Sequence, residues 1–220
     1  MEDNKNDYIF EILEAWASEY TPGKLLATGR FRDGGWSGQG PALFAFGPWS
    51  QGNPPSHGTD LDYVTLLCYT STLDYDQVQH TMENYHHSDE WAGGAWLTAG
   101  NRSAVVFVGT KGVGDCWYGD QDGPCLDCDG ERGWWSTGFE GRFIFYDPAD
   151  FAAVAYGTKE PWEPQPYAFL NVDEYLFGIE STQQKYHLGA ACFDRERGFF
   201  YVFEPRADGE QPLIHVWKIE

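Results

Sequence analysis

The densest group of residues that could perform chemistry lies between positions 115 and 131, where acidic residues are interspersed with glycines. Ca²⁺ prefers several carboxylate and carbonyl oxygens supplied by one flexible loop. Four acids of this loop are therefore candidate calcium ligands: Asp120, Asp122, Asp127 and Asp129. The Asp-x-Asp-Gly spacing at 120–123 matches the start of a calcium-binding loop, but the later acids do not fall at the remaining ligand positions. The favoured interpretation is therefore a solvated acidic hairpin tip, with calcium binding as the alternative.

Three cysteines occupy the same loop, in the spacing C-x8-C-x2-C: Cys116, Cys125 and Cys128. A structural zinc site requires four soft ligands, and no histidine lies nearby in the sequence. A disulfide from Cys116 to Cys125 or to Cys128 is the favoured interpretation, and it indicates an extracellular or periplasmic compartment. We expect this loop to be oxidised or metal-bound, because three free thiols on an exposed loop are reactive.

Trp134 and Trp135 follow this loop and are candidate ligand-binding residues. Aromatic rings on loops over a rigid scaffold can stack on sugars or other flat ligands, although they can equally seal a loop against the protein. The sequence contains no nucleophile elbow, phosphate-binding glycine loop or HExxH motif. A glycosidase needs two carboxylates across a cleft, and the many acidic residues of this chain could supply such a pair.

The charge balance limits the partners of this chain. Acidic residues outnumber basic residues by 34 to 14, which gives a formal charge of −20 over 220 residues. Nucleic acids and anionic membranes bind basic surfaces, so neither is expected as a partner. No stretch approaches the ~18 consecutive apolar residues of a membrane span. The first seven residues also lack the basic start and apolar stretch of a secretory signal.

Short apolar runs bounded by Gly, Pro, Asp or Asn predict an all-β fold. Their aromatic and β-branched content favours strands, and their continuous apolar character indicates sheets that are covered on both faces. The runs occupy residues 42–46, 63–69, 104–108, 142–146, 199–203 and 213–217.

Helix is scarce in the expected structure. The clearest case covers residues 148–156, because Asp147 can cap its start, Pro148 suits the first position and Gly157 can end it. We divide the chain into an N-terminal lead segment, residues 1–23, and a β domain, residues 24–220. A further helix is expected over Tyr8–Trp16 of the lead segment.

An internal repeat gives the most specific architectural signal. Residues 94–108 and 189–203 align without gaps at an offset of 95, and each combines a small-residue strand, a polar turn and a stronger apolar strand. Residues 40–44 resemble the opening strand of a third copy. This pattern is typical of propeller blades of roughly 40–50 residues, so we expect about three blades of a partial or assembled propeller. The alternative is a β-sandwich with similar hairpins.

Longer motifs resemble those of a family of uncharacterised, mostly bacterial, aromatic-rich proteins. The resemblance covers nearly all of residues 25–220, and its motifs lie at 25–41, 89–97, 133–136, 146–150, 161–167 and 193–198. It implies a propeller-like fold of which this chain is the C-terminal half. It implies no catalytic residues, because the family carries no established activity.

These observations together favour a non-catalytic, propeller-like module for binding or assembly. Three blades do not close a ring, and their open faces would expose apolar side chains. We expect a second copy or a separate chain to complete the propeller. The alternative function is a carbohydrate-active enzyme, a glycoside hydrolase or lyase, with an acidic pair in a Trp-lined cleft.

Overall fold

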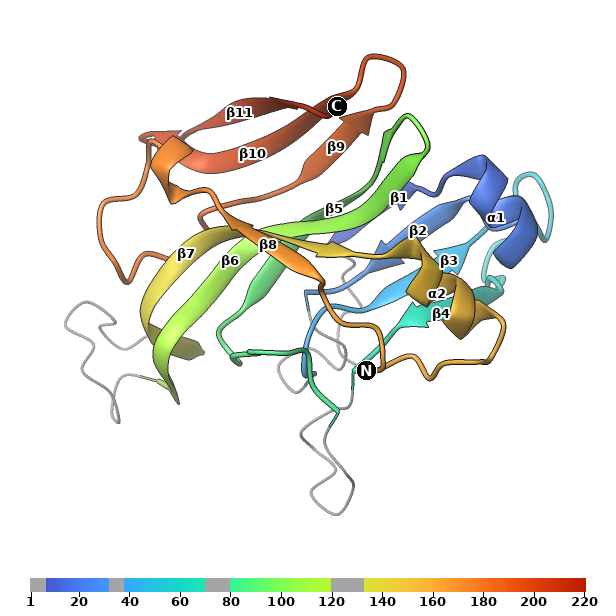
Figure 1. Cartoon of the computed structure of the whole chain (residues 1–220), viewed down its shortest axis with the longest axis horizontal. Coiled ribbons are helices and arrows are strands. Elements are labelled where there is room, and N and C mark those ends of the chain that lie inside the picture. The colour runs from blue at the N-terminus through green and yellow to red at the C-terminus, as the bar shows by residue number, and fades with distance from the viewer. Residues whose placement is uncertain (1–6, 32–37, 70–79, 120–132) are drawn as a thin grey trace.

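The computed structural model describes residues 7–31, 38–69, 80–119 and 133–220. It is 45% strand and 10% helix, which confirms the all-β prediction. The strands form three antiparallel sheets, each built from strands that follow one another in the sequence. Figure 1 shows one sheet at the top, one across the middle and one on the right.

Sheet A, the first of the three, has the strand order β1-β2-β3-β4 and consists of β1 (Tyr8–Glu11), β2 (Leu26–Gly29), β3 (Leu43–Phe46) and β4 (Tyr63–Leu67). Sheet B has the order β5-β6-β7-β8 and consists of β5 (Glu90–Ala99), β6 (Arg102–Tyr118), β7 (Trp134–Tyr146) and β8 (Ala168–Asn171). Sheet C has the order β11-β10-β9 and consists of β9 (Ala191–Asp194), β10 (Phe199–Asp208) and β11 (Gln211–Lys218).

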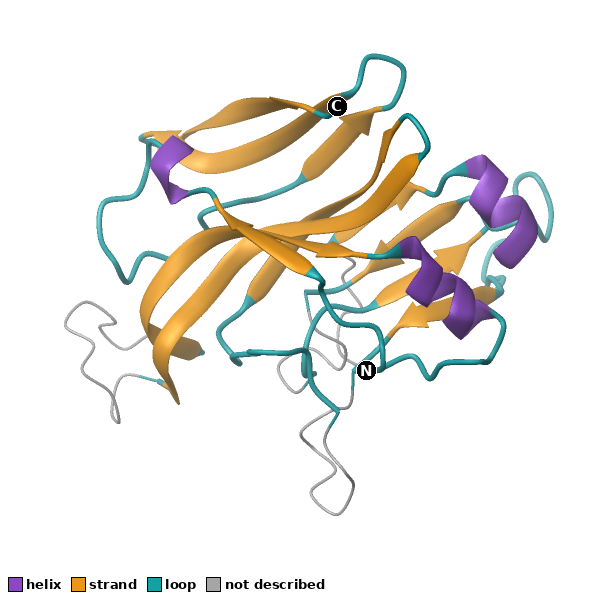
Figure 2. Cartoon of the chain, in the orientation of Figure 1, coloured by secondary structure: helices purple, strands orange, loops and turns teal. Residues whose placement is uncertain are grey.

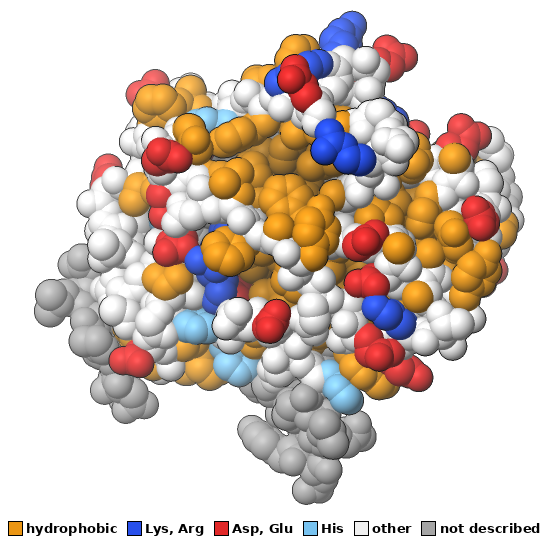
Figure 3. All heavy atoms as spheres, in the orientation of Figure 1, with side chains coloured by type: hydrophobic (Ala, Val, Ile, Leu, Met, Phe, Trp, Pro, Cys, Tyr) orange, Lys and Arg blue, Asp and Glu red, His pale blue; other side chains and the backbone are white. Residues whose placement is uncertain are grey.

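Sheet B lies between the other two sheets, so its apolar strands are covered on both faces, as the continuous runs predicted. Alternate residues of β6 enter different cores, because successive side chains of a strand point to opposite faces. Val105 and Phe107 belong to the core shared with sheet A. Val106 and Val108 belong to the core shared with sheet C. Figure 3 shows hydrophobic side chains gathered in the hollow between sheet C and sheet B.

Two α-helices, α1 (Glu14–Tyr20) and α2 (Pro148–Ala155), lie together at one end of the molecule (Figure 2). The predicted helix at 148–156 is confirmed: the Asp147 carboxylate accepts a hydrogen bond from the Ala149 N–H, and Gly157 adopts a positive φ of 73° just past its end. Trp16 of α1 lies against Trp96 of β5, with ring centroids 4.8 Å apart. A 3₁₀ turn, η2, covers Asp173–Tyr175.

The two halves of the repeat are both antiparallel hairpins, β5–β6 and β9–β10, but their registers differ. Ala99 pairs with Arg102, whereas Asp194, which aligns with Ala99, pairs with Phe199. The expected third opening strand at residues 40–44 is wrong, because β3 is the third strand of sheet A and β1 takes the first position. The helix expected over Tyr8–Trp16 is also wrong over its first half, where β1 pairs with β2. The Tyr8 side chain stabilises this strand, because its buried hydroxyl donates a hydrogen bond of 2.6 Å to the carbonyl oxygen of Ala42.

The first strands of the three sheets lie side by side, with β5 between β1 and β9. Two glycines of β5 allow this approach. A Cβ on Gly93 would lie 2.7 Å from the carbonyl oxygen of Gly189, beside β9. A Cβ on Gly94 would lie 2.7 Å from the ring of Phe10 in β1.

Candidate functional site

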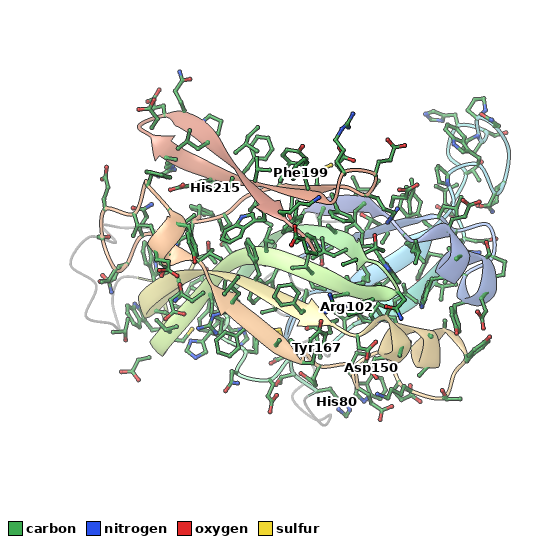
Figure 4. The ribbon with its side chains drawn as sticks, turned by 45° about the horizontal axis from the view of Figure 1, so that its top comes forward. His80, Arg102, Asp150, Tyr167, Phe199 and His215 are labelled. Carbon is green, nitrogen blue, oxygen red and sulfur yellow. The ribbon has the colours of Figure 1, made fainter. Side chains whose placement is uncertain are left out.

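A cavity of about 450 Å³ lies against sheet B, between the loop at residues 82–84 and the segment leading into β8. We call it the β8 cavity, and its lining includes Trp91, Lys111, Arg142, Ile144, Tyr167 and Phe169. Figure 4 shows Tyr167 beside the start of β8, and His215 far from it on β11.

The strand register places the lining side chains on one face of sheet B. Ile144 of β7 pairs with Phe107 of β6 on one side and with Phe169 of β8 on the other. Arg142 is two residues from Ile144, and Lys111 is four residues from Phe107, so both share this face. Phe107 belongs to the core shared with sheet A, so the cavity continues the face that sheet A covers.

Lys111 is held by a buried ion pair. Its Nζ lies 2.9 Å from Oδ1 of Asp89 and donates a second hydrogen bond, of 2.7 Å, to the carbonyl oxygen of Gly112. The Asp89 carboxylate, which is fully buried, also accepts hydrogen bonds from the backbone N–H groups of His86 and Gly112. Burial raises the pKa of Asp89, and the Lys111 charge and these donors oppose that rise. Burial likewise lowers the pKa of Lys111, and Asp89 opposes that fall.

Some N–H groups of the Arg142 guanidinium have no hydrogen-bond partner within the described residues. Its Nη2 donates to a carboxylate oxygen of Glu140, and its Cζ lies 4.6 Å from the ring centre of Phe169. Its buried Nε has no hydrogen-bond partner among these residues. The indole Nε1 of Trp91, which is fully buried, has none there either. Both nitrogen atoms are closed off from the cavity, so the Nη1 group of Arg142, which makes no hydrogen bond within these residues, is the donor available to a ligand.

A small polar cluster lies near this charged pair. The hydroxyl oxygens of Ser88 and Ser136 are 2.6 Å apart, and Nδ1 of His86 lies 3.4 Å from that of Ser136. Burial lowers the pKa of His86, and the charges of Lys111 and Arg142 lower it further. No carboxylate within the described residues hydrogen-bonds to the His86 ring. Among these residues, nothing takes the part of the third group that orients the base in a nucleophilic triad.

The two predicted tryptophans lie on opposite faces of β7 at its start. Trp134 stacks on His87 with ring centroids 4.3 Å apart, and Trp135 is 7% exposed. The ammonium group of Lys185 lies 3.7 Å from the ring centre of Trp135. Trp135 also lines a second cavity, of about 520 Å³, on the side of residues 178–186.

The predicted calcium ligands, Asp120, Asp122, Asp127 and Asp129, lie outside the described residues, as do Cys125 and Cys128. Cys116 is described, and its thiol lies 3.8 Å from the Ser88 hydroxyl. The calcium and disulfide predictions therefore stay predictions. Within the ranges that the structure describes, no three His, Cys, Asp or Glu side chains form a group that could hold a metal.

Sequence reasoning did not single out Lys111 or Arg142. The available signal was a lysine inside a long β-branched and glycine-rich strand, where a charge must be paired if it is buried. Its partner could not be read from the sequence, because Asp89 lies 22 positions away in a loop.

The chain finds no match among protein-family models, curated proteins or solved structures. Within the described residues, no helix has both the length and the apolar character that crossing a membrane requires. The function must therefore be argued from the architecture and the cavities.

Proposed function

We propose that the chain is a non-catalytic assembly module: three propeller-like blades that form half of a ring. A second copy supplies the other half, and a two-fold axis through the centre of the ring relates the two copies. The observation that carries this proposal is the apolar character of the two sheet faces that nothing among the described residues covers. These are the faces of sheets A and C that point away from sheet B.

The outer face of sheet C is apolar along β10 and β11. Val202 of β10 points into the core with sheet B, so the alternate residue Tyr201 faces outward. Tyr201 pairs with Val216, and Phe203 pairs with Ile214. Val216 is 55% exposed and Ile214 is 53% exposed.

The outer face of sheet A has a similar character. Ile9 and Phe44 occupy one row across the sheet, through the pairs that Thr28 makes with each of them. Ile9 is 60% exposed. In the next row, Tyr63 is 64% exposed and its ring contacts Phe44 edge to face. Apolar faces of this kind mark interaction surfaces in soluble proteins.

The packing already present within the chain argues for a second copy as the occupant. Sheets A and C each pack one face on sheet B, with the first strands at the shared edge. Sheet C of one copy against sheet A of the other continues that arrangement. Two such junctions close a ring by symmetry, which leaves no apolar face open. The resemblance to propeller-like proteins favours the same architecture.

Single substitutions on each face test this ring. We expect the wild-type chain to have about twice the 24.9 kDa mass of one copy in multi-angle light scattering. Val216→Lys and Ile9→Lys should each shift the equilibrium to the monomer, because each places a charge in one of the two junctions. Physiological salt is used, since two copies of charge −20 repel each other.

The matched control is Tyr156→Lys. Tyr156 is 62% exposed at the end of α2, outside both faces, so this variant should remain dimeric. A ring also requires that both face variants dissociate. If only one of them becomes monomeric, identical faces pair with each other and the ring is wrong. A monomeric wild-type chain at about 100 μM would refute the assembly altogether.

Among the described residues, the two cavities above do not offer the acidic pair of a glycosidase. Retaining and inverting enzymes use two carboxylates roughly 5–10 Å apart across the substrate. The β8 cavity is lined by a single carboxylate, that of Glu83, and the cavity beside Trp135 by that of Glu180. Neither therefore offers the required pair.

A further inference from the structure

We propose that the β8 cavity binds a small organic carboxylate that carries an aromatic ring. This site is independent of the proposed ring, because its lining residues belong to one chain. Its volume of about 450 Å³ falls within the ~300–1,000 Å³ range of small-ligand sites. Three features of the wall support this ligand: its apolar side, the Arg142 guanidinium and its charge.

The apolar side of the cavity suits an aromatic body. Trp91, Ile144 and Phe169 line it from three strands of sheet B, and Tyr167 adds a further ring at the entrance to β8. Such walls bury a flat ring by offset or edge-to-face contacts. Ile144 is 4% exposed and Trp91 is fully buried, so this part of the wall is fixed in place by the core.

The Arg142 guanidinium suits a carboxylate. Within the described part of the chain it makes one hydrogen bond, from Nη2 to Glu140, so Nη1 is left without a partner there. Nε of Arg142 and Nε1 of Trp91 have no accessible surface, so a ligand in the cavity does not reach them in this conformation. A guanidinium offers its N–H groups in a planar fork that matches the two oxygens of a carboxylate. The Phe169 ring, 4.6 Å from Cζ of Arg142, limits the positions that this fork can take.

The charges that face the cavity also favour an anion. Lys111 and Arg142 line it with positive groups, whereas their partners Asp89 and Glu140 are not among the lining residues. Glu83 is the carboxylate that lines the cavity, and it is exposed, so water screens its charge. The chain as a whole has a charge of −20, so an anion is attracted to these positive groups and repelled by the acidic remainder of the surface.

Titration of the full wild-type chain with two probes tests the site. Phenylacetate has the proposed chemistry, and phenylacetamide has the same shape without the charge. We expect phenylacetate to bind and phenylacetamide to bind at least about tenfold more weakly, as measured by calorimetry. In ¹⁵N-labelled protein the indole signal of Trp91, assigned by its loss in Trp91→Phe, should shift during the phenylacetate titration.

Arg142→Gln should weaken phenylacetate binding at least about tenfold, since it removes the charged fork. The matched control is Arg102→Gln, because Arg102 is an exposed arginine at the β5–β6 turn that bonds to the Glu220 carbonyl oxygen. This control should bind as the wild type does. If Arg142→Gln fails to fold, Arg142→Lys keeps the charge and loses the fork, and it should also bind more weakly.

Four results would overturn the proposal. They are no binding of phenylacetate to the wild type, equal binding of phenylacetamide, unchanged binding by a folded Arg142 variant, or a titration that shifts other indole signals and leaves that of Trp91 in place.

Discussion

At the scale of single residues, the ion pair between Lys111 and Asp89 connects sheet B to the loop before β5. Both partners are buried: the side chain of Lys111 is 5% exposed and that of Asp89 is 0% exposed. Removing water from two charges is unfavourable, and the attraction and four hydrogen bonds described above offset this only while both partners are present. The pair therefore makes the structure intolerant of losing either one.

Lys111→Met should lower the free energy of unfolding by about 3–5 kcal/mol, because it leaves the Asp89 carboxylate buried without its counter-charge. The comparison is Lys159→Met, which removes a surface pair with Asp150 and should cost about 0–1 kcal/mol. Urea denaturation at neutral pH measures both. If the two variants lose the same free energy of unfolding, the buried pair contributes no more to stability than the surface pair does.

His86 should make stability depend on pH. Its pKa in the folded protein is lowered by burial and then by Lys111 and Arg142, whereas in the unfolded chain it is about 6.5. Between these two values the unfolded state binds more protons, so the free energy of unfolding falls as the pH drops through this interval. We expect His86→Asn to reduce this dependence between pH 7 and pH 5. A His86→Asn variant with an unchanged slope would assign the pH dependence to other groups.

At the scale of elements, β5 is the strand on which the architecture depends. It pairs with β6 inside sheet B and lies between β1 and β9. Its glycines at positions 93 and 94 remove the side chains that would separate these neighbours. The close packing of β5 against β1 and β9 therefore requires small residues at these two positions.

Gly93→Ala should destabilise the protein by about 1–3 kcal/mol, because the added Cβ would lie 2.7 Å from a backbone oxygen that cannot move alone. Gly189→Ala is the matched control across the same contact. Its added Cβ would find its nearest neighbour at 3.4 Å, an ordinary contact distance, so it should be tolerated. Thermal unfolding of the two variants distinguishes them, and similar melting temperatures would contradict the close approach of β5 and β9.

At the scale of the whole molecule, the sequence predicted the strands much better than their arrangement. The six apolar runs and the capped helix at 148–156 carried strong local signals, namely β-branched and aromatic residues between turn residues, and Asp-Pro at a helix start. β1 was missed because Tyr8–Glu11 is short and becomes a strand only by pairing with β2. Local propensity cannot report such a partner.

The candidate site was predictable to a smaller degree than the fold. Trp134 and Trp135 were visible as adjacent aromatic residues, and Trp135 does line a cavity. Arg142 resembled an ordinary strand residue, because its role depends on Phe169, which the β7–β8 register places beside it. Sites built from several strands of a sheet become visible only when that register is known.

The position of sheet B in the middle of the chain has a consequence for synthesis on the ribosome. Sheet A is complete once Leu67 has emerged, yet the face formed by residues such as Leu43 and Leu66 packs against Phe107 and Tyr146 of sheet B. Roughly 80 more residues must be made before Tyr146 emerges, which takes about 4–16 s at ~5–20 residues per second. During that interval the nascent chain exposes a complete apolar face, which makes it prone to aggregation until sheet B is made.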